Sequence, residues 1–241
     1  MVEKILSERV RYVCADNVDY MEGIDDGFFD LVIADPPYFK GPEKGGCYFR
    51  NGKKSSNGIL KTEYDSLEHW DLPKDVFWEH LSRVGKESLV WGINYFDVDL
   101  GGGRLVWDKC NGSSTFSDCE IAYTSYHDSV RMFRYMWNGM MQGKSIEKGH
   151  VMQGRKELNE RRIHQNQKPV LLWLWFYRKH IKKLPGIPFR ILDLNMGSGT
   201  SGIAASYFGD VEYVGVDKDK RMFGKACDYY EEYHAKFPQL S

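Results

Sequence analysis

Short apolar runs alternate with helical patterns along most of this chain, and that alternation restricts the fold more than any other feature. Seven runs rich in β-branched and aromatic residues predict strands: Val10 to Ala15, Phe28 to Ala34, Ser88 to Trp91, Arg104 to Trp107, Glu120 to Tyr126, Arg190 to Leu194 and Glu212 to Val216. Helical patterns follow several of them: Pro73 to Val84, Pro169 to Lys183, Thr200 to Phe208 and Lys220 to Lys236. Together they predict an α/β fold with a doubly wound, mostly parallel sheet of seven strands. We expect one domain over residues 1–241, a length that can bury a full core.

Composition restricts the compartment and the possible partners. The net charge is -1, so the chain as a whole is not a basic nucleic-acid binder, and charge has to be examined locally. The five cysteines lack any CxxC pair, which argues against a disulfide framework and a zinc site, and we expect no metal. No signal-peptide pattern or long apolar run occurs. We therefore expect a cytoplasmic protein without membrane contact.

Asp35-Pro36-Pro37-Tyr38 follows the predicted strand that ends at Ala34. Open α/β sheets keep their chemistry at the C-terminal ends of strands. Two successive prolines fix φ, which holds Asp35 and Tyr38 in a defined relation. The segment therefore predicts a catalytic site, although an ordinary turn with a packed tyrosine is the alternative.

Two long stretches interrupt the alternation, Lys40 to Lys61 and Arg131 to Gln165. Each has an excess of five positive over negative side chains. Basic loops beside an active-site edge favour a polyanionic partner held through phosphate contacts. Aromatic residues within them are candidates for stacking on bases: Tyr48, Phe49, Phe133, Tyr135 and Trp137. The alternative is a pair of solvated surface loops.

A glycine-rich turn, Asn195 to Gly202, joins the predicted strand Arg190 to Leu194 to a helix. Glycines let the backbone approach a ligand, and the helix N-terminus offers free N–H groups. The next strand ends at Asp217, whose carboxylate can accept both hydroxyls of a ribose. Asp193 suits a cationic amino-acid head group better than a pyrophosphate. The same glycines also fit the dinucleotide fingerprint G-x-G-x-x-G, so a nicotinamide or flavin enzyme is a competing interpretation.

The chain resembles the S-adenosylmethionine-dependent DNA amino-methyltransferases, in the permuted group whose catalytic motif precedes the cofactor motif. Asp35-Pro36-Pro37-Tyr38 resembles their catalytic tetrad, and Asp193 to Thr200 resembles their cofactor loop. The segment His164 to Pro169 is similar to the His-Pro-Thr-Gln-Lys-Pro signature before their capping helix. Trp91 to Phe96 and Trp107 to Lys109 also resemble segments of small phage and prokaryotic members.

The resemblance implies the roles of the site residues. The catalytic residues are Asp35, Pro36, Pro37 and Tyr38, and the cofactor-binding residues are Asp16, Asp35, Lys168, Asp193, Asn195, Gly197, Ser198, Gly199, Thr200 and Asp217. The expected cofactor is S-adenosylmethionine, which leaves as S-adenosylhomocysteine. Asp193-Leu194-Asn195 departs from the usual Asp-Pro-Phe, which removes an aromatic wall, and Gln165 replaces a proline.

The expected reaction is methyl transfer to the N6 amine of adenine in double-stranded DNA. Asp35 and the Pro36 carbonyl would accept the two N–H bonds of the amine, and Tyr38, with Phe39, would stack on a flipped base. Cytosine N4 suits the physics equally, and an RNA target is a further alternative. Residues 40–66 are predicted to be a mobile DNA-facing loop and residues 128–165 a target-recognition region. We expect a monomer or homodimer in a prokaryotic or phage-infected cell.

Overall fold

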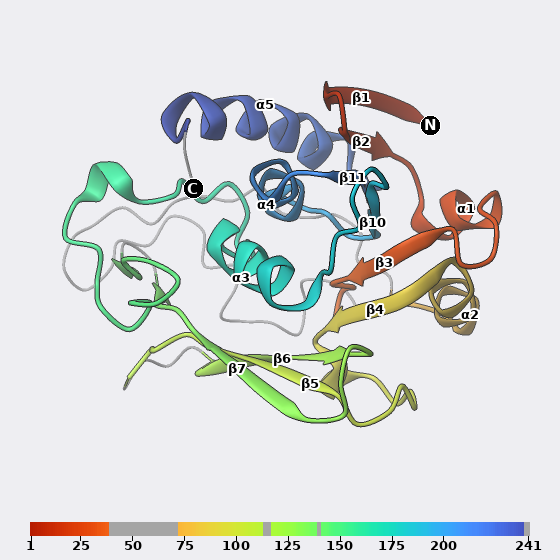
Figure 1. Cartoon of the computed structure of the whole chain (residues 1–241), viewed down its shortest axis with the longest axis horizontal. Helices are drawn as coiled ribbons and strands as arrows, with labels where there is room; N and C mark the ends of the chain where they lie inside the picture. The colour runs from red at the N-terminus through yellow and green to blue at the C-terminus, as the bar shows by residue number, and fades with distance from the viewer. Residues whose placement is uncertain (39–71, 113–116, 139–140, 239–241) are drawn as a thin grey trace.

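The computed structural model describes residues 1–38, 72–112, 117–138 and 141–238. Nine of the described strands form one sheet in the order β1-β2-β11-β10-β3-β4-β6-β5-β7, which runs from top to bottom of Figure 1. Their bounds are β1 Val2–Ser7, β2 Val10–Cys14, β3 Phe29–Ala34, β4 Gly85–Trp91, β5 Arg104–Asp108, β6 Cys119–Thr124, β7 Val130–Arg134, β10 Phe189–Asp193 and β11 Val211–Asp217. The α/β fold with a mostly parallel sheet is confirmed.

The central strands β2, β11, β10, β3 and β4 are parallel. β6 pairs antiparallel with both β4 and β5, so its first residue lies at the edge where the parallel strands end. All seven predicted strands are present. The predicted number was too low because β1 and β7 extend the two edges of the sheet, where one face stays exposed and the apolar pattern is weak.

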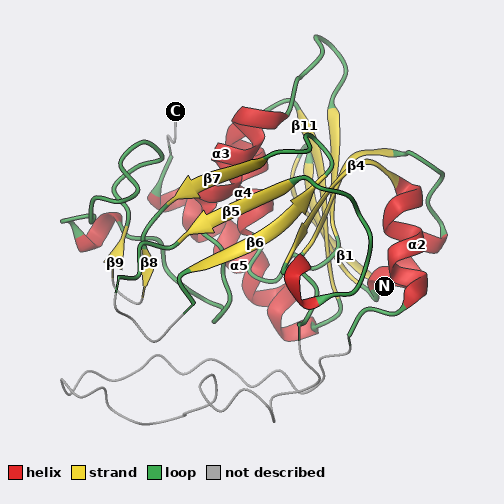
Figure 2. Cartoon of the chain, turned by 90° about the horizontal axis from the view of Figure 1, so that it is seen from below, coloured by secondary structure: helices red, strands yellow, loops and turns green. Residues whose placement is uncertain are grey.

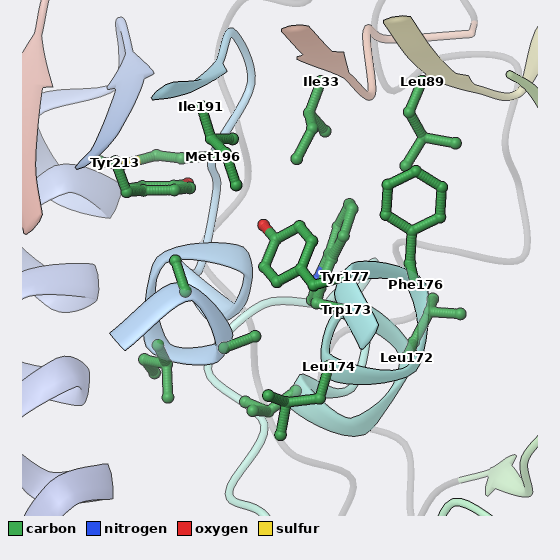
Figure 3. Packing of buried hydrophobic residues seen from close by; sticks show 14 of the residues in the cluster. Ile33, Leu89, Leu172, Trp173, Leu174, Phe176, Tyr177, Ile191, Met196 and Tyr213 are labelled. Carbon is green, nitrogen blue, oxygen red and sulfur yellow. The ribbon is translucent and has the colours of Figure 1, made fainter. Parts of the chain in front are cut away.

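Helices cover both faces of the sheet (Figure 1). The four predicted helices are present as α2 Asp75–Val84, α3 Val170–His180, α4 Thr200–Phe208 and α5 Lys220–Lys236, and the short α1 Asn17–Glu22 was not predicted. One apolar cluster joins α3, α4 and α5 to the sheet, and a second joins α1 and α2 to its other face. In Figure 3 the aromatic side chains of α3 point toward the sheet, with Phe176 facing Leu89.

The stretch from Arg131 to Gln165, apart from residues 139–140, contains regular structure and packs aromatic side chains into the main core. It contains the end of β7, a two-stranded sheet of β8 Trp137–Asn138 and β9 Met141–Gln142, and the 3-10 helix η3 Lys156–Leu158 (Figure 2). Phe133, Tyr135 and Trp137 are at most 5% exposed. The prediction that these three rings stack on bases is therefore wrong, because they pack in the protein core. The other basic stretch, with Phe39, Tyr48, Phe49 and the predicted loop 40–66, lies outside the described residues.

None of the helices in the described residues combines the length and the apolar character that crossing a membrane requires.

Candidate active site

The acid Asp35 follows directly after β3, at the C-terminal edge of the parallel strands. The phenol of Tyr38 donates a 2.5 Å hydrogen bond to Asp35 Oδ1. Burial and the Asp35 carboxylate raise the pKa of Tyr38 well above its ordinary value, so the phenol stays protonated as the donor. The turn Asp35-Pro36-Pro37-Tyr38 thus closes on itself and presents an acid and an aromatic ring together.

The ring of Tyr38 packs on the segment after β4. It stacks on Tyr95 with a centroid distance of 4.8 Å and an interplanar angle of 17°, and it meets Phe96 edge to face. Gly92 has φ +68°, and a Cβ there would lie 2.0 Å from the Tyr38 ring. Only glycine therefore fits both the backbone and the space beside Tyr38.

The glycine-rich loop after β10 packs against Tyr12 and Tyr213. A Cβ on Gly199 would lie 2.5 Å from the Tyr12 hydroxyl, and one on Gly202 would lie 2.7 Å from it. The Tyr12 hydroxyl donates to the Gly199 carbonyl at 2.7 Å. The glycines at 199 and 202 therefore serve close packing of α4 on the sheet, and the Gly199 φ of +71° makes the turn into that helix.

Asp193 lies beneath this loop and is 2% exposed. Its Oδ2 accepts hydrogen bonds from the hydroxyls of Ser201 at 2.5 Å and Tyr213 at 3.1 Å, and its Oδ1 accepts from the Asn195 N–H at 3.1 Å. Burial raises the pKa of Asp193 to about 6, although these hydrogen bonds oppose the rise. The contacts give Asp193 a role in shaping the loop, and its direct contact with a ligand stays a prediction.

Thr200 and Ser198 are also buried in the loop. The Thr200 hydroxyl accepts from the indole N–H of Trp173 at 3.1 Å, which joins the loop to α3. Asn195 Oδ1, in contrast, is buried without a hydrogen-bond donor among the described residues. A buried acceptor without a donor is costly, so this atom is suited to accept from a bound ligand.

Two further acids lie at the ends of the neighbouring strands. Asp217 ends β11, and its carboxylate accepts from the N–H groups of Gly197 at 3.0 Å and Asp219 at 2.8 Å. Burial raises its pKa to about 6 against the effect of those two hydrogen bonds. Asp16 follows β2 and caps α1 through the Val18 N–H at 2.9 Å. Because β2 and β11 are parallel neighbours, both acids lie at the same edge.

The two halves of the predicted site meet at one pair of strands. β10 and β3 are parallel neighbours, and the ladder continues past β10 with a 2.9 Å bond from the Leu194 N–H to the Ile33 carbonyl. The glycine-rich loop therefore starts beside Ile33 and Ala34, the two residues that precede Asp35. A strand from the second half of the chain, β10, thus pairs with a strand from the first half, β3, and this pairing brings the cofactor motif next to the catalytic motif that precedes it in the sequence.

Lys168 contacts the Asp35 carboxylate directly. The resemblance implied a cofactor role for this lysine, and the contact with Asp35 was not predicted. Glu120, at the start of β6, forms a second ion pair with Lys168, with 3.2 Å between Glu120 Oε2 and Lys168 Nζ. The sequence analysis did not identify Glu120 as a site residue, because it belongs to no motif and reaches the site only through the antiparallel course of β6.

Within the described residues no group of three histidine, cysteine or acidic side chains is placed to hold a metal ion, and the cysteines among them are free thiols.

Comparisons with known proteins give structural matches only. No protein-family profile matches the chain, and no curated protein matches its sequence. The structure is similar to that of PvuII DNA methyltransferase (cytosine-N4-specific), with a TM-score of 0.55, 12% identity, and coverage of 93% of this chain and 86% of that one. It is also similar to TTHA0409 from Thermus thermophilus, which is assigned as a DNA modification methylase, with a TM-score of 0.50, 15% identity and coverage of 98% of both chains. At such low identity the likeness concerns architecture, and the chain therefore has the α/β fold seen in these DNA methylase structures.

Proposed function

We propose that this protein is an S-adenosylmethionine-dependent DNA methyltransferase that methylates the N6 amine of adenine in double-stranded DNA. One observation carries the proposal: the Asp35-Pro36-Pro37-Tyr38 turn and the glycine-rich loop follow adjacent parallel strands, β3 and β10. A donor held by the loop and a base held by the turn would thus face each other across one strand spacing, about 5 Å.

The residues of the loop fit the expected cofactor. Asp217, at the end of β11, would supply carboxylate oxygens for the ribose hydroxyls, and Asp16, which follows the neighbouring strand β2, would contact the adenine. Asn195 Oδ1 is the buried acceptor that the ammonium of the methionine moiety would satisfy. When bound, S-adenosylmethionine supplies an electrophilic methyl group on a sulfonium.

Asp35 and the Pro36 carbonyl provide what the target nitrogen needs. The exocyclic amine is a weak nucleophile because its lone pair is delocalised into the base. Two acceptors on its N–H bonds favour a tetrahedral nitrogen and stabilise the positive charge that develops during transfer. The methylated nitrogen then loses a proton readily, so no strong base is required.

Tyr38 provides the surface on which an extrahelical base would stack. An amine inside a base pair is out of reach of a partly buried acid, so the base has to leave the duplex first. Tyr95 and Phe96 support the ring of Tyr38 from the neighbouring loop. The aromatic group therefore holds the base plane while Asp35 holds its amine.

The basic side chains of residues 128–165 are the proposed contacts with the DNA backbone. Some of them already have partners within the protein: Arg134 pairs with Asp108, Arg161 pairs with Glu232, and Arg162 donates a hydrogen bond to the Gln165 carbonyl. Arg131 lies on the exposed edge strand β7, and Lys144 and Lys148 follow β9. We infer that target recognition uses the polar and basic surface of this region, since its aromatic rings are buried. The predicted loop 40–66 would add further backbone contacts.

Two alternatives concern the target, and one concerns the class of enzyme. Cytosine N4 presents the same amine chemistry, and the PvuII protein is specific for it; Asp35 at the head of the tetrad favours adenine by resemblance. An RNA target is the second alternative. Against a nicotinamide enzyme, β6 lies antiparallel between β4 and β5, where a dinucleotide-binding sheet continues in parallel.

The test is methyl incorporation from labelled S-adenosylmethionine into duplex DNA, RNA and protein. We expect label in duplex DNA, and sequencing of that DNA identifies the modified base and its context. Asp35→Ala should abolish incorporation while S-adenosylhomocysteine still binds. Asp228→Ala, which removes an exposed aspartate on α5, is the matched control and should be fully active.

Each alternative has its own outcome in this experiment. Label in RNA alone would replace the substrate, and N4-methylcytosine would replace the base. Calorimetric binding of NAD in preference to S-adenosylhomocysteine would reject the methyltransferase class. Full activity of Asp35→Ala would remove Asp35 from the mechanism.

A further inference from the structure

A second carboxylate, Glu120, lies beside the proposed catalytic acid, and no recognised motif marks it. Glu120 pairs with Trp107 of β5, near the start of β6. β6 runs antiparallel to β4, with Trp91 opposite Ala122, so Glu120 lies just beyond the C-terminal end of β4. An antiparallel strand thus brings its first residues to the edge where the parallel strands bring their last.

Four charged side chains alternate in sign from Asp35 outward. Lys168 Nζ contacts Asp35 Oδ2 and lies 3.2 Å from Glu120 Oε2. Glu120 Oε1 in turn lies 2.6 Å from Lys109 Nζ. The chain of contacts is therefore Asp35, Lys168, Glu120, Lys109, and its formal charge sums to zero.

Lys168 is the most buried member of this network. The side chain of Lys168 is 3% exposed, that of Lys109 18%, and those of Asp35 and Glu120 22% each. A buried ammonium is costly unless all its donors are paired. Lys168 Nζ has two carboxylates and the face of the Trp91 ring, whose centroid is 5.1 Å away. Lys168 Nζ donates a hydrogen bond to Asp35 Oδ2, whereas Glu120 Oε2 makes no hydrogen bond within the described residues, so the contact between Lys168 and Glu120 is an ion pair.

The pKa shifts agree with a charged network. Burial alone would lower the pKa of Lys168, but the charges of Asp35 and Glu120 outweigh it and raise that pKa. Burial alone would raise the pKa of Glu120, but the charges of Lys168 and Lys109 outweigh it and lower that pKa. Both groups are therefore ionised near neutral pH.

We propose that Glu120, held by Lys109, is a positioning residue for Asp35 and acts through the ammonium of Lys168. The inference rests on the proposed function, since it assigns Asp35 to the target amine. The Lys168 ammonium interacts with both carboxylates, so Glu120 neutralises part of its charge. Lys168 can therefore orient Asp35 Oδ2 without forming an exclusive ion pair with Asp35. If Glu120 lost its charge, Asp35 alone would neutralise a buried cation. The carboxylate would turn toward Lys168 and accept less strongly from the amine.

The charge-removing variant Glu120→Gln tests this with almost no change in shape. We expect kcat to fall by about tenfold to a hundredfold, while the Kd of S-adenosylhomocysteine stays within about twofold, because Glu120 itself is not among the expected cofactor contacts and the charge of Lys168 is kept. Glu120→Asp keeps the charge and should recover a large part of kcat. Glu231→Gln, which breaks the exposed Lys4–Glu231 pair at the opposite edge of the sheet, is the matched control and should keep full activity.

Lys109 supplies a test of the order of the network. Lys109→Met should lower kcat less than Glu120→Gln does, since it acts one contact further out. In the Glu120→Gln background it should lower kcat no further, because the residue through which it acts is already neutral. Independent, additive losses would overturn the proposed chain of contacts.

Two outcomes overturn the inference, and they differ from failure of the proposed function. Unchanged kcat in Glu120→Gln rejects it, and so does a loss of kcat that is matched by an equal loss of cofactor affinity and is not recovered in Glu120→Asp. Crystal structures of the wild type and Glu120→Gln decide it even if the wild type transfers no methyl group. An Asp35 carboxylate that keeps its position in Glu120→Gln rejects the inference, whereas an inactive wild type rejects the function.

Discussion

Tyr38 and Asp35 are three residues apart, and the phenol of one donates a 2.5 Å hydrogen bond to Oδ1 of the other. Lys168 takes the second carboxylate oxygen. Both oxygens of the acid are thus oriented by protein donors, and each retains one lone pair for a ligand. The arrangement is typical of an acid that accepts hydrogen bonds in a fixed direction. It gives Tyr38 two separate functions: its hydroxyl orients Asp35, and its ring offers a stacking surface.

Substitutions at Tyr38 distinguish its ring from its hydroxyl. Tyr38→Phe keeps the stack on Tyr95 but removes the bond to Asp35, and we expect kcat to fall about tenfold, the cost of one hydrogen bond to a charged group. Tyr38→Ala also removes the stacking surface and should in addition weaken binding of the target base by about 1–3 kcal/mol, or roughly fivefold to 150-fold. Steady-state methylation with 2-aminopurine fluorescence as a reporter of base flipping measures both. Equal effects of the two variants would contradict a separate role for the ring.

Gly199 is expected to be indispensable for cofactor binding. Alanine there would place a Cβ 2.5 Å from the Tyr12 hydroxyl at a φ of +71°, so the loop has to move. We expect Gly199→Ala to weaken S-adenosylhomocysteine binding by at least about a hundredfold and to lower Tm, measured by calorimetry and thermal melting.

Gly186→Ala is the control for that variant. Gly186 has a similar φ of +77° but no atom within 4 Å of its Cβ position, so it incurs the backbone strain without the clash. Its cofactor affinity should equal that of the wild type. If Gly199→Ala bound as well as Gly186→Ala, close packing on Tyr12 would not be what the loop requires.

Local sequence predicted those parts of the site that are contiguous in the chain. The acid with its two prolines follows one buried strand, the glycine-rich turn follows another, and parallel strands bring both to one edge. The central strands and α4 and α5 were predicted closely, because buried parallel strands leave continuous apolar runs and helices of nine or more residues leave a clear pattern. The edge strands β1 and β7 and the six-residue α1 were missed, because half-exposed strands and short helices leave weak patterns.

What the sequence did not predict depends on pairing between distant segments. Glu120 reaches Asp35 only because β6 turns back beside β4, and nothing in its neighbourhood in the chain marks it as different from a surface glutamate. The aromatics Phe133, Tyr135 and Trp137 were assigned to a DNA surface on local charge, but tertiary packing buries them. A polar, basic stretch of sequence indicates that the backbone runs near the surface, but it does not indicate whether each aromatic side chain in it is exposed or buried.

Cofactor binding should depend on pH through Asp217. Burial raises the pKa of this acid to about 6, and the ribose hydroxyls require an ionised acceptor. The affinity for S-adenosylhomocysteine should therefore be constant above pH 7 and fall as the pH drops through 6. We expect a loss of about tenfold between pH 7 and pH 5, measured by calorimetry. Asp217→Asn should bind more weakly and show a flatter profile, and an unchanged profile in that variant would assign the dependence to another group.

Glu160 predicts a pH dependence of stability that is separate from catalysis. Its carboxylate accepts from the first N–H of α3, that of Val170, at 3.0 Å, and it is 7% exposed. Burial raises its pKa to about 8, against 4.5 in the unfolded chain. Between these values the folded state binds the extra proton, so the contribution of Glu160 to stability is fully present below about pH 4.5 and is lost as the pH rises through 8. Glu160→Gln keeps an acceptor for Val170 without a charge and should lack this decline. We expect its Tm to exceed that of the wild type by about 5 °C at pH 9 and to match it at pH 5.

Glu157→Gln, which replaces an exposed glutamate in η3, is the control and should follow the wild type at every pH. A Glu160→Gln curve parallel to that of the wild type would mean that the buried carboxyl ionises at its ordinary pKa.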